Sequence, residues 1–227
     1  MKPKQISYEK DFFETLYKDR IGDFAISDLN RNENWFYTWI TLIKKTIPFE
    51  KGKRVLELGC AIGGASAILK DMGFEIYASD VSRYVIKNSK KLRPDINFLV
   101  IDVTKKIQLG GTFDYIIAFE VLEHLEEPNS AIKNINKKLK DGGWLVFSTP
   151  PPYKRFIETP THVNVHGKQH WINLLEKNGF KGKNIIVKEV SFIPLLYRLN
   201  KYLNIPIPFN LDIPMLSSTI FYFAKKN

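Results

Sequence analysis

The sequence predicts an α/β fold, a doubly wound and mostly parallel sheet of seven strands with helices on both faces. Three observations support this prediction. Short apolar runs recur through residues 54–149, and runs of this kind suit strands buried on both faces. Helix-like segments separate them, which indicates βαβ units. Two further strand-like runs near the C-terminus suit an antiparallel pair that closes the sheet.

Each element can be assigned in chain order. The expected parallel strands are residues 54–58, 75–80, 96–101, 113–118 and 143–149. The helices between them are expected at 64–72, 82–92 and 129–140, and we expect Asp141-Gly142-Gly143 to end the last one as a glycine C-cap. A helix at 167–178 stops at Asn178-Gly179, and the closing strands are expected at 184–190 and 217–224.

The 227 residues suit one domain, because two equal domains would be cramped. Within it we expect an N-terminal helical cap over residues 1–50, a cofactor-binding core over 51–190 and an apolar cap insertion over 191–216, before the last strand. The insertion is too interrupted by proline and polar residues for a membrane span.

Two apolar segments lie outside the strand and helix alternation. Residues 33–47 place Trp35, Trp39, Leu42 and Ile43 on one helical face, which predicts packing on the sheet or over a pocket mouth, with core packing favoured. A long loop of apolar composition is usually functional. We therefore expect several aromatic and aliphatic residues of the insertion to cap an acceptor pocket together with that helix, the alternative being that they cover a core edge or a dimer contact. These residues are Phe192, Leu195, Leu196, Tyr197, Tyr202 and Phe209.

The net charge of +10 raises the question of a nucleic-acid partner. The densest basic runs, 87–93 and 133–140, fall at the ends of predicted helices, where cations favour the helix dipole and stay in water. A nucleic-acid partner is therefore not expected. The N-terminus has no signal-peptide pattern, so we expect a cytoplasmic protein, as a monomer or homodimer, in which Cys60 is a small loop residue.

The stretch VLELGCAIGGAS, residues 55–66, is a strand followed by a glycine turn and a helix. Read from Gly59, it is one substitution short of the dinucleotide pattern, because Ala61 replaces the second glycine. Glu57 lies two residues before Gly59, where a carboxylate suits an ammonium group and would repel a pyrophosphate. Asp80 ends the next strand, where an acid accepts hydrogen bonds from ribose hydroxyls. Asp102 follows the third strand and suits an adenine amine. Acids after three successive strands thus predict a pocket for a cationic adenosine.

This set of motifs resembles the class I S-adenosylmethionine-dependent methyltransferases, in particular the ubiquinone-biosynthesis O-methyltransferase group of small-molecule enzymes. The resembling segments, in the family's order, are VLELGCAIGG (55–64), ASD (78–80), IDV (101–103), FDYIIAFEVLEHL (113–125) and LKDGGWLVFSTPPP (139–152). The resemblance implies a Rossmann-like sheet and S-adenosyl-L-methionine as cofactor.

The resemblance also implies residue roles. Gly59, Ala61 and Gly63 would line the methionine part of the cofactor. Asp80 and Val81 would bind the ribose, Asp102 and Val103 the adenine, and Phe119 would lie beneath the sulfonium. Ala61 departs from the family's usual glycine, and an alanine suits this turn if its φ stays negative.

Methyl transfer needs a general base only if the acceptor must lose a proton. Histidine is the usual candidate near neutral pH. His162 and His124 follow the fifth and fourth strands at the edge where ligands bind in open α/β sheets, so we take them as the candidate catalytic residues. His166 and His170 are weaker candidates by position.

Glu120, Glu123 and His124 would share one face if the chain turned helically there, and together they could ligate a metal. They resemble the Glu-x-x-Glu-His of metal-dependent ubiquinone-type and small-RNA 2′-O-methyltransferases, in which a later histidine can complete the shell. The same string occurs in relatives thought to need no metal, so we assign no metal ligand.

STPPPY, 148–153, is interpreted as a rigid turn, because an amino-methyltransferase signature would follow the fourth strand and not the fifth.

The favoured function is methylation of a small molecule, at oxygen rather than nitrogen. The alternatives are an RNA 2′-O-methyltransferase with a Glu/Glu/His metal site, a nicotinamide-dependent oxidoreductase and a catalytically silent module that binds an adenosine ligand.

Overall fold

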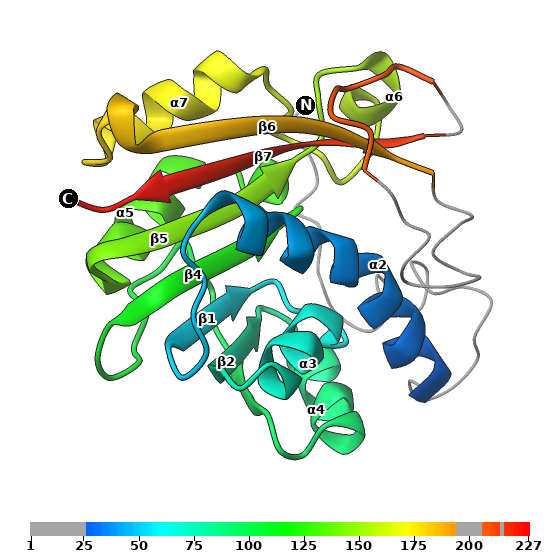
Figure 1. Ribbon diagram of the computed structural model, residues 1–227, viewed down its shortest axis with the longest axis vertical. Coiled ribbons are helices and arrows are strands. Elements are labelled where there is room, and N and C mark those ends of the chain that lie inside the picture. The colour runs from blue at the N-terminus through cyan, green and yellow to red at the C-terminus, as the bar shows by residue number, and fades with distance from the viewer. Residues whose placement is uncertain (1–25, 194–205, 214–215) are drawn as a thin grey trace.

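A computed structural model describes residues 26–193, 206–213 and 216–227. Within these ranges seven strands form one sheet in the order β3-β2-β1-β4-β5-β7-β6 (Figure 1). The strands are β1 (Arg54–Leu58), β2 (Glu75–Asp80), β3 (Asn97–Val100), β4 (Phe113–Phe119), β5 (Leu139–Thr149), β6 (Ile185–Phe192) and β7 (Ser217–Lys225). The first five run parallel, while β7 runs antiparallel to both β5 and β6. The predicted fold class, including the C-terminal antiparallel pair, is confirmed.

Helices cover both faces of this sheet. They are α2 (Ile26–Thr46), α3 (Gly64–Asp71), α4 (Arg83–Leu92), α5 (Pro128–Lys138), α6 (Lys154–Ile157) and α7 (Lys168–Lys177), with the short 3₁₀ helices η1 (Leu122–His124) and η2 (Gly182–Asn184). Buried residues of α2, α3 and α4 share one core layer, and those of α5 and α7 share the other. Among the described residues, no helix combines the length and apolar character that a membrane crossing requires.

The predicted glycine C-cap at Asp141-Gly142-Gly143 is wrong. Helix α5 ends at Lys138, and the chain is already extended at Leu139, with φ −75° and ψ 142°. The two glycines exchange backbone hydrogen bonds with the end of the C-terminal strand, since Gly142 donates to Lys226 at 3.1 Å and Lys226 donates to Gly143 at 2.9 Å. The glycine pair therefore belongs to β5, which is longer than the predicted 143–149.

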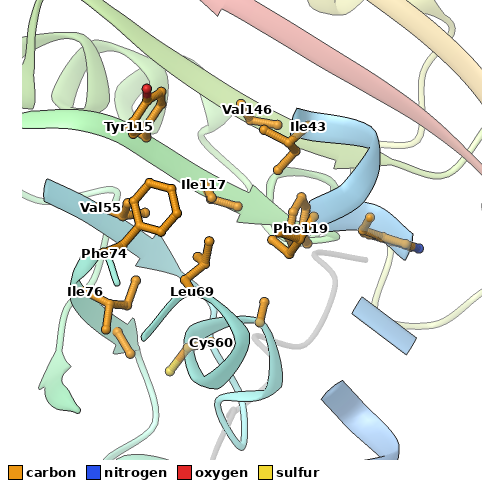
Figure 2. Packing of buried hydrophobic residues seen from close by; sticks show 14 of the residues in the cluster. Ile43, Val55, Cys60, Leu69, Phe74, Ile76, Tyr115, Ile117, Phe119 and Val146 are labelled. Atoms are coloured by element: carbon orange, nitrogen blue, oxygen red, sulfur yellow. The ribbon is translucent and has the colours of Figure 1, made fainter. Parts of the chain in front are cut away.

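Helix α2 packs on the sheet, as its apolar face predicts. Trp39 and Ile43 are buried, and Trp35 and Leu42 are half-buried against the same core. Figure 2 shows Ile43 of α2 beside Val146 of β5, in the cluster that also holds Phe119 of β4. Core packing, the favoured expectation for this helix, is therefore what the structure shows.

The insertion before the last strand is described only at its two ends. Phe192 is wrongly assigned to the cap, because it is the last residue of β6, pairs with Ser217 and is buried against Trp35 and Trp39. Phe209 is 52% exposed. The other four predicted cap residues, Leu195, Leu196, Tyr197 and Tyr202, lie outside the described residues.

Candidate active site

The candidate site lies at the carboxyl edge of the parallel strands. The glycine turn follows β1, Asp80 ends β2, Asp102 comes shortly after β3, and Phe119 ends β4. Because these strands are neighbours in the parallel part of the sheet, their carboxyl ends meet at one edge. The sequence placed all four features at this edge.

The glycines of the turn are required by packing inside the protein itself. Gly59 has φ +71° and Gly63 has φ +88°, values that favour glycine. A Cβ at Gly59 would collide with the side chain of Val121, and one at Gly63 would lie 2.8 Å from the ring of Phe98. Val121 follows β4 and Phe98 belongs to β3, so the turn is seated between the ends of other strands.

Ala61 does not keep the negative φ expected of it. Its φ is +46°, in the left-handed region, where a residue with a side chain is strained by about 1 to 2 kcal/mol. Two side chains hold it there. The Asp80 carboxylate accepts the Ala61 N–H at 3.1 Å, and the Ser89 hydroxyl donates to the Ala61 carbonyl at 3.0 Å. The turn is thus fixed by α4 and by the acid at the end of β2.

Glu57 is buried beside the start of α3. The Ser66 hydroxyl donates a hydrogen bond to its carboxylate, and its exposed fraction is 2%. Burial raises the pKa of Glu57 to about 7, against the opposing effect of the Ser66 hydrogen bond. Glu57 therefore carries a proton over part of the physiological range, which the sequence did not indicate.

Asp80 is also nearly buried, while its neighbour Val81 is 46% exposed. One carboxylate oxygen of Asp80 accepts the Ser82 N–H at 3.0 Å, and the other accepts the Ala61 N–H. Burial raises the pKa of Asp80, and these backbone hydrogen bonds oppose the shift. Asp80 therefore organises the glycine turn in addition to any ligand it binds.

Asp102 lies in a more open setting, and its neighbour Val103 is buried. Its carboxylate accepts hydrogen bonds from the backbone and the hydroxyl of Thr104 and pairs with Lys105 at 3.1 Å. Partial burial favours the protonated form, but Thr104 and Lys105 together hold the pKa of Asp102 below its usual value. It remains an ionised acceptor at this edge.

Phe119 closes the aromatic core at the end of β4. Its ring stacks on that of Phe36 of α2, with ring centroids 5.5 Å apart and an interplanar angle of 14°. It also meets the Trp39 ring edge to face, with centroids 5.1 Å apart. Helix α2 therefore reaches the residue predicted to lie beneath the sulfonium.

Two carboxyl groups follow β4, of which Glu120 is half-buried and Glu123 fully buried. Glu120 has φ +52° and accepts hydrogen bonds from Ser148 at 2.8 Å and Thr219 at 2.7 Å. Glu123 has no exposed surface, and neither of its carboxyl oxygens accepts a hydrogen bond from any described residue. Burial, and then the charge of Glu120, raise the pKa of Glu123 well above its usual value. A buried carboxylate without a donor is costly unless it takes up a proton, as the raised pKa indicates, or a ligand joins it.

The predicted helical face of Glu120, Glu123 and His124 is not formed. Only residues 122–124 turn helically, as η1, and the left-handed Glu120 stands outside that turn. His162 takes the place expected of Glu120. Glu123, His124 and His162 each place one possible ligand atom within 4.8 Å of the others.

The two catalytic candidates of the sequence thus belong to one cluster. Nδ1 of His124 lies 2.8 Å from the Thr161 carbonyl oxygen, and Nδ1 of His162 lies 2.9 Å from that of Phe156. A carbonyl can only accept, so each Nδ1 carries the proton and each Nε2 is the unprotonated nitrogen. Burial lowers the pKa of His124 to about 4 and also lowers that of His162. His166 and His170 instead stack on each other, with ring centroids 3.8 Å apart, beside Trp171.

Residues 31–183 match a family model described as a methyltransferase domain. The chain belongs to this methyltransferase-domain family. It is 32% identical over 132 residues to the ubiquinone biosynthesis O-methyltransferase of Coxiella burnetii (strain RSA 493 / Nine Mile phase I), covering 56% of this chain and 54% of that protein. It is 31% identical over 115 residues to the demethylmenaquinone methyltransferase of Renibacterium salmoninarum, covering 49% of this chain and 48% of that protein. This methyltransferase-domain chain spans about half the length of the curated relatives it matches.

Solved structures share the fold of this methyltransferase domain. Magnesium protoporphyrin IX methyltransferase from Synechocystis PCC 6803, with bound SAM, has a TM-score of 0.60 and 19% identity and covers 96% of this chain and 90% of that chain. For phosphoethanolamine N-methyltransferase 2 from Haemonchus contortus the TM-score is 0.66 and the identity 15%, and the match covers 95% of this chain and 59% of that chain. The expected family and fold are therefore confirmed.

Proposed function

We propose that the chain transfers a methyl group from S-adenosyl-L-methionine to a small molecule, at an oxygen atom. The acceptor oxygen forms a bond to the methyl carbon as the bond from that carbon to the sulfonium sulfur breaks. S-adenosylhomocysteine leaves, and the acceptor loses its proton. The protein's part is to align donor and acceptor and to exclude water. The observation that carries the proposal is the convergence of the glycine turn, Asp80, Asp102 and Phe119 at one edge of a methyltransferase-family sheet.

The cofactor roles follow the order of the strands. Gly59, Ala61 and Gly63 border the methionine part, and Glu57 lies behind the turn, where ionisation would favour the cofactor's ammonium group. Val81 is exposed beside Asp80 and offers an apolar contact to the ribose side. Asp102 is the ionised acceptor for the adenine amine, next to the buried Val103. Phe119 presents an aromatic ring near the reacting sulfonium, and cations are attracted to aromatic faces.

We further propose that Glu123, His124 and His162 hold a divalent cation. The arrangement fits one, because the buried Glu123 carboxyl lacks a donor and each imidazole uses Nδ1 on a backbone carbonyl. Ligating histidines commonly make such a bond with their other nitrogen. A bound cation would supply Lewis-acid activation of an acceptor hydroxyl. Glu120, fixed by Ser148 and Thr219, would position Glu123 from behind. In the absence of a cation, His162 and His124 stay candidates for the general base.

A ribose 2′-hydroxyl of RNA is the second candidate acceptor. The cluster of Glu123, His124 and His162 is compatible with this acceptor, because a cation held there would act on any hydroxyl group placed beside it. The weakly clustered charge favours a small molecule. A nicotinamide-dependent oxidoreductase is disfavoured, because Glu57 lies where a pyrophosphate would be repelled and the family model is that of a methyltransferase.

Transfer of a radioactive methyl group tests the proposal directly. The chain is incubated with labelled S-adenosylmethionine and three acceptor sets: catechols and phenols with apolar side chains, small amines, and short single-stranded RNA. We expect label in the hydroxylated small molecules and release of S-adenosylhomocysteine. Label in RNA alone would favour the second candidate, and binding of NAD in preference to S-adenosylhomocysteine would overturn both.

A further inference from the structure

The first turn of α3 lacks a cap from its own chain segment. The residue at the N-cap position is Gly63, which has no side chain and makes no side-chain hydrogen bond. Side-chain oxygens at this position normally accept one of the free N–H groups at a helix start. Here the oxygen comes from another helix, because Oδ1 of Asn32 in α2 accepts the Gly64 N–H at 3.0 Å.

This contact also explains why residue 64 is glycine. A Cβ at Gly64 would collide with the Asn32 amide and would lie 2.8 Å from the main-chain carbonyl carbon of Asn32. The backbone of α2 therefore approaches the beginning of α3 as closely as a residue without a side chain allows. The contact is between backbones as well as between a side chain and a backbone.

The same stretch of α2 reaches a second part of the candidate site. Phe36 lies one turn after Asn32, on the same helix face, and it stacks on Phe119 at the end of β4. One helix thus contacts the start of α3 through Asn32 and the predicted sulfonium neighbour through Phe36. Helix α2 is anchored in the core by Leu29 near its start and by Trp39, Ile40 and Ile43 further along, whereas residues 32–37 between them are half-buried.

We infer that Asn32 is a positioning residue that fastens the first half of α2 to the glycine turn and thereby couples cofactor binding to the placement of the aromatic residues on α2. The inference rests on the proposed function. It implies that a cofactor that orders the turn also orders Trp35 and Phe36. It also implies that loss of the Asn32 hydrogen bond lowers the affinity for the cofactor, although no group that touches the cofactor is removed.

The test compares Asn32→Ala with Asn32→Asp and with Asn30→Ala. Asp keeps the acceptor oxygen, and Asn30 is an exposed asparagine of the same helix, so it serves as the matched control. S-adenosylhomocysteine affinity is measured by calorimetry, and amide hydrogen exchange is followed with and without this ligand. We expect Asn32→Ala to weaken binding by about five- to tenfold, in keeping with the usual effect of a lost cap. We expect Asn32→Asp and Asn30→Ala to bind within about twofold of the parent.

Hydrogen exchange supplies the readout that a merely structural role would not move. In the parent, the ligand should slow exchange both at residues 64–67 and at residues 29–37. In Asn32→Ala it should slow exchange only at 64–67. A Gly64→Ala chain, in which the new Cβ forces α2 away, should reproduce this separation. A folded Asn32→Ala chain with parental affinity and ligand protection of 29–37 would overturn the inference. A parent that fails to bind S-adenosylhomocysteine would overturn the proposed function instead.

Discussion

The centroids of the His124 and His162 imidazole rings lie 4.9 Å apart, and the ring planes are inclined by 69°, although the whole of α5, β5 and α6 lies between the two residues in the sequence. Each ring donates its Nδ1 proton to a backbone carbonyl, so Nε2 is the unprotonated nitrogen of both rings. Glu123 completes the cluster, with its Oε1 3.8 Å from Nε2 of His124.

Removal of divalent cations tests this cluster. We expect a chelator to abolish methyl transfer and added Mg²⁺, Mn²⁺ or Zn²⁺ to restore it. His162→Ala should weaken cation binding at least about tenfold, because the remaining ligands cannot complete the shell. His170→Ala is the matched control, since His170 is exposed and outside the cluster. Full activity in chelator, with no cation found by elemental analysis, would return both histidines to the general-base hypothesis.

Asp80→Ala should weaken S-adenosylhomocysteine binding at least about tenfold. Charge-assisted hydrogen bonds to a ribose contribute about 1.5 to 3 kcal/mol, and Asp80 also holds the Ala61 N–H. Asp141→Ala, whose carboxylate is 84% exposed, is the control and should bind normally. A folded Asp80→Ala chain with an unchanged dissociation constant, measured by calorimetry, would show that the ribose is bound elsewhere.

Exchanging alanine and glycine in the turn should give effects of opposite sign. Ala61→Gly relieves a left-handed alanine, and this gain of about 1 to 2 kcal/mol outweighs the backbone entropy cost of glycine, about 0.5 to 1 kcal/mol. Thermal unfolding should therefore shift upward by roughly 1 to 4 °C. Gly63→Ala should lower the melting temperature, because residue 63 has φ +88° and its new Cβ would press against the Phe98 ring. A lower melting temperature for Ala61→Gly would contradict the strained turn.

Protonation of Glu57 should make stability depend on pH. Its folded pKa of about 7 is raised above the unfolded value, so its contribution is fully present below about pH 4.5 and is lost as the pH rises to about 7. Glu57→Gln should remove this pH dependence, whose total over the range is at most about 3 kcal/mol of unfolding free energy. Unfolding by denaturant at about pH 5 and about pH 8 measures it. The exposed Glu126→Gln should keep the parental slope, and an unchanged slope in Glu57→Gln would refute the assignment.

The sheet was predictable because its signals are local. Apolar runs, helix periodicity and turn glycines each depend on neighbouring residues, and they placed all seven strands in order. The failures concern contacts distant in sequence. Gly142 and Gly143 were mistaken for a helix cap because their partner is Lys226. The positive φ of Ala61 depends on Asp80 and Ser89, which local pattern cannot show.

The candidate site divides in the same way. Strand ends can be read from a sequence, so the position of Asp80, Asp102 and Phe119 at one edge of the sheet was predicted correctly, while their roles toward a cofactor stay predictions. His162 was found as a candidate base, but its meeting with Glu123 depends on the loop after β5 folding back onto η1, where Val163 and Asn164 both donate to the Glu123 carbonyl at 2.9 Å. Asn32 carried no signal, because a cap supplied by a different helix leaves no spacing rule to recognise.

The pairing of Phe192 with Ser217 means that the chain leaves the sheet and returns to it at adjacent points. Closing a longer loop between fixed neighbours adds only slowly to its entropic cost. Segments of other lengths and compositions could therefore be exchanged between these two residues while β1 to β5 stay as they are. If this segment caps the acceptor pocket, as its apolar composition predicts, such an exchange would change acceptor preference and leave the glycine turn as it is.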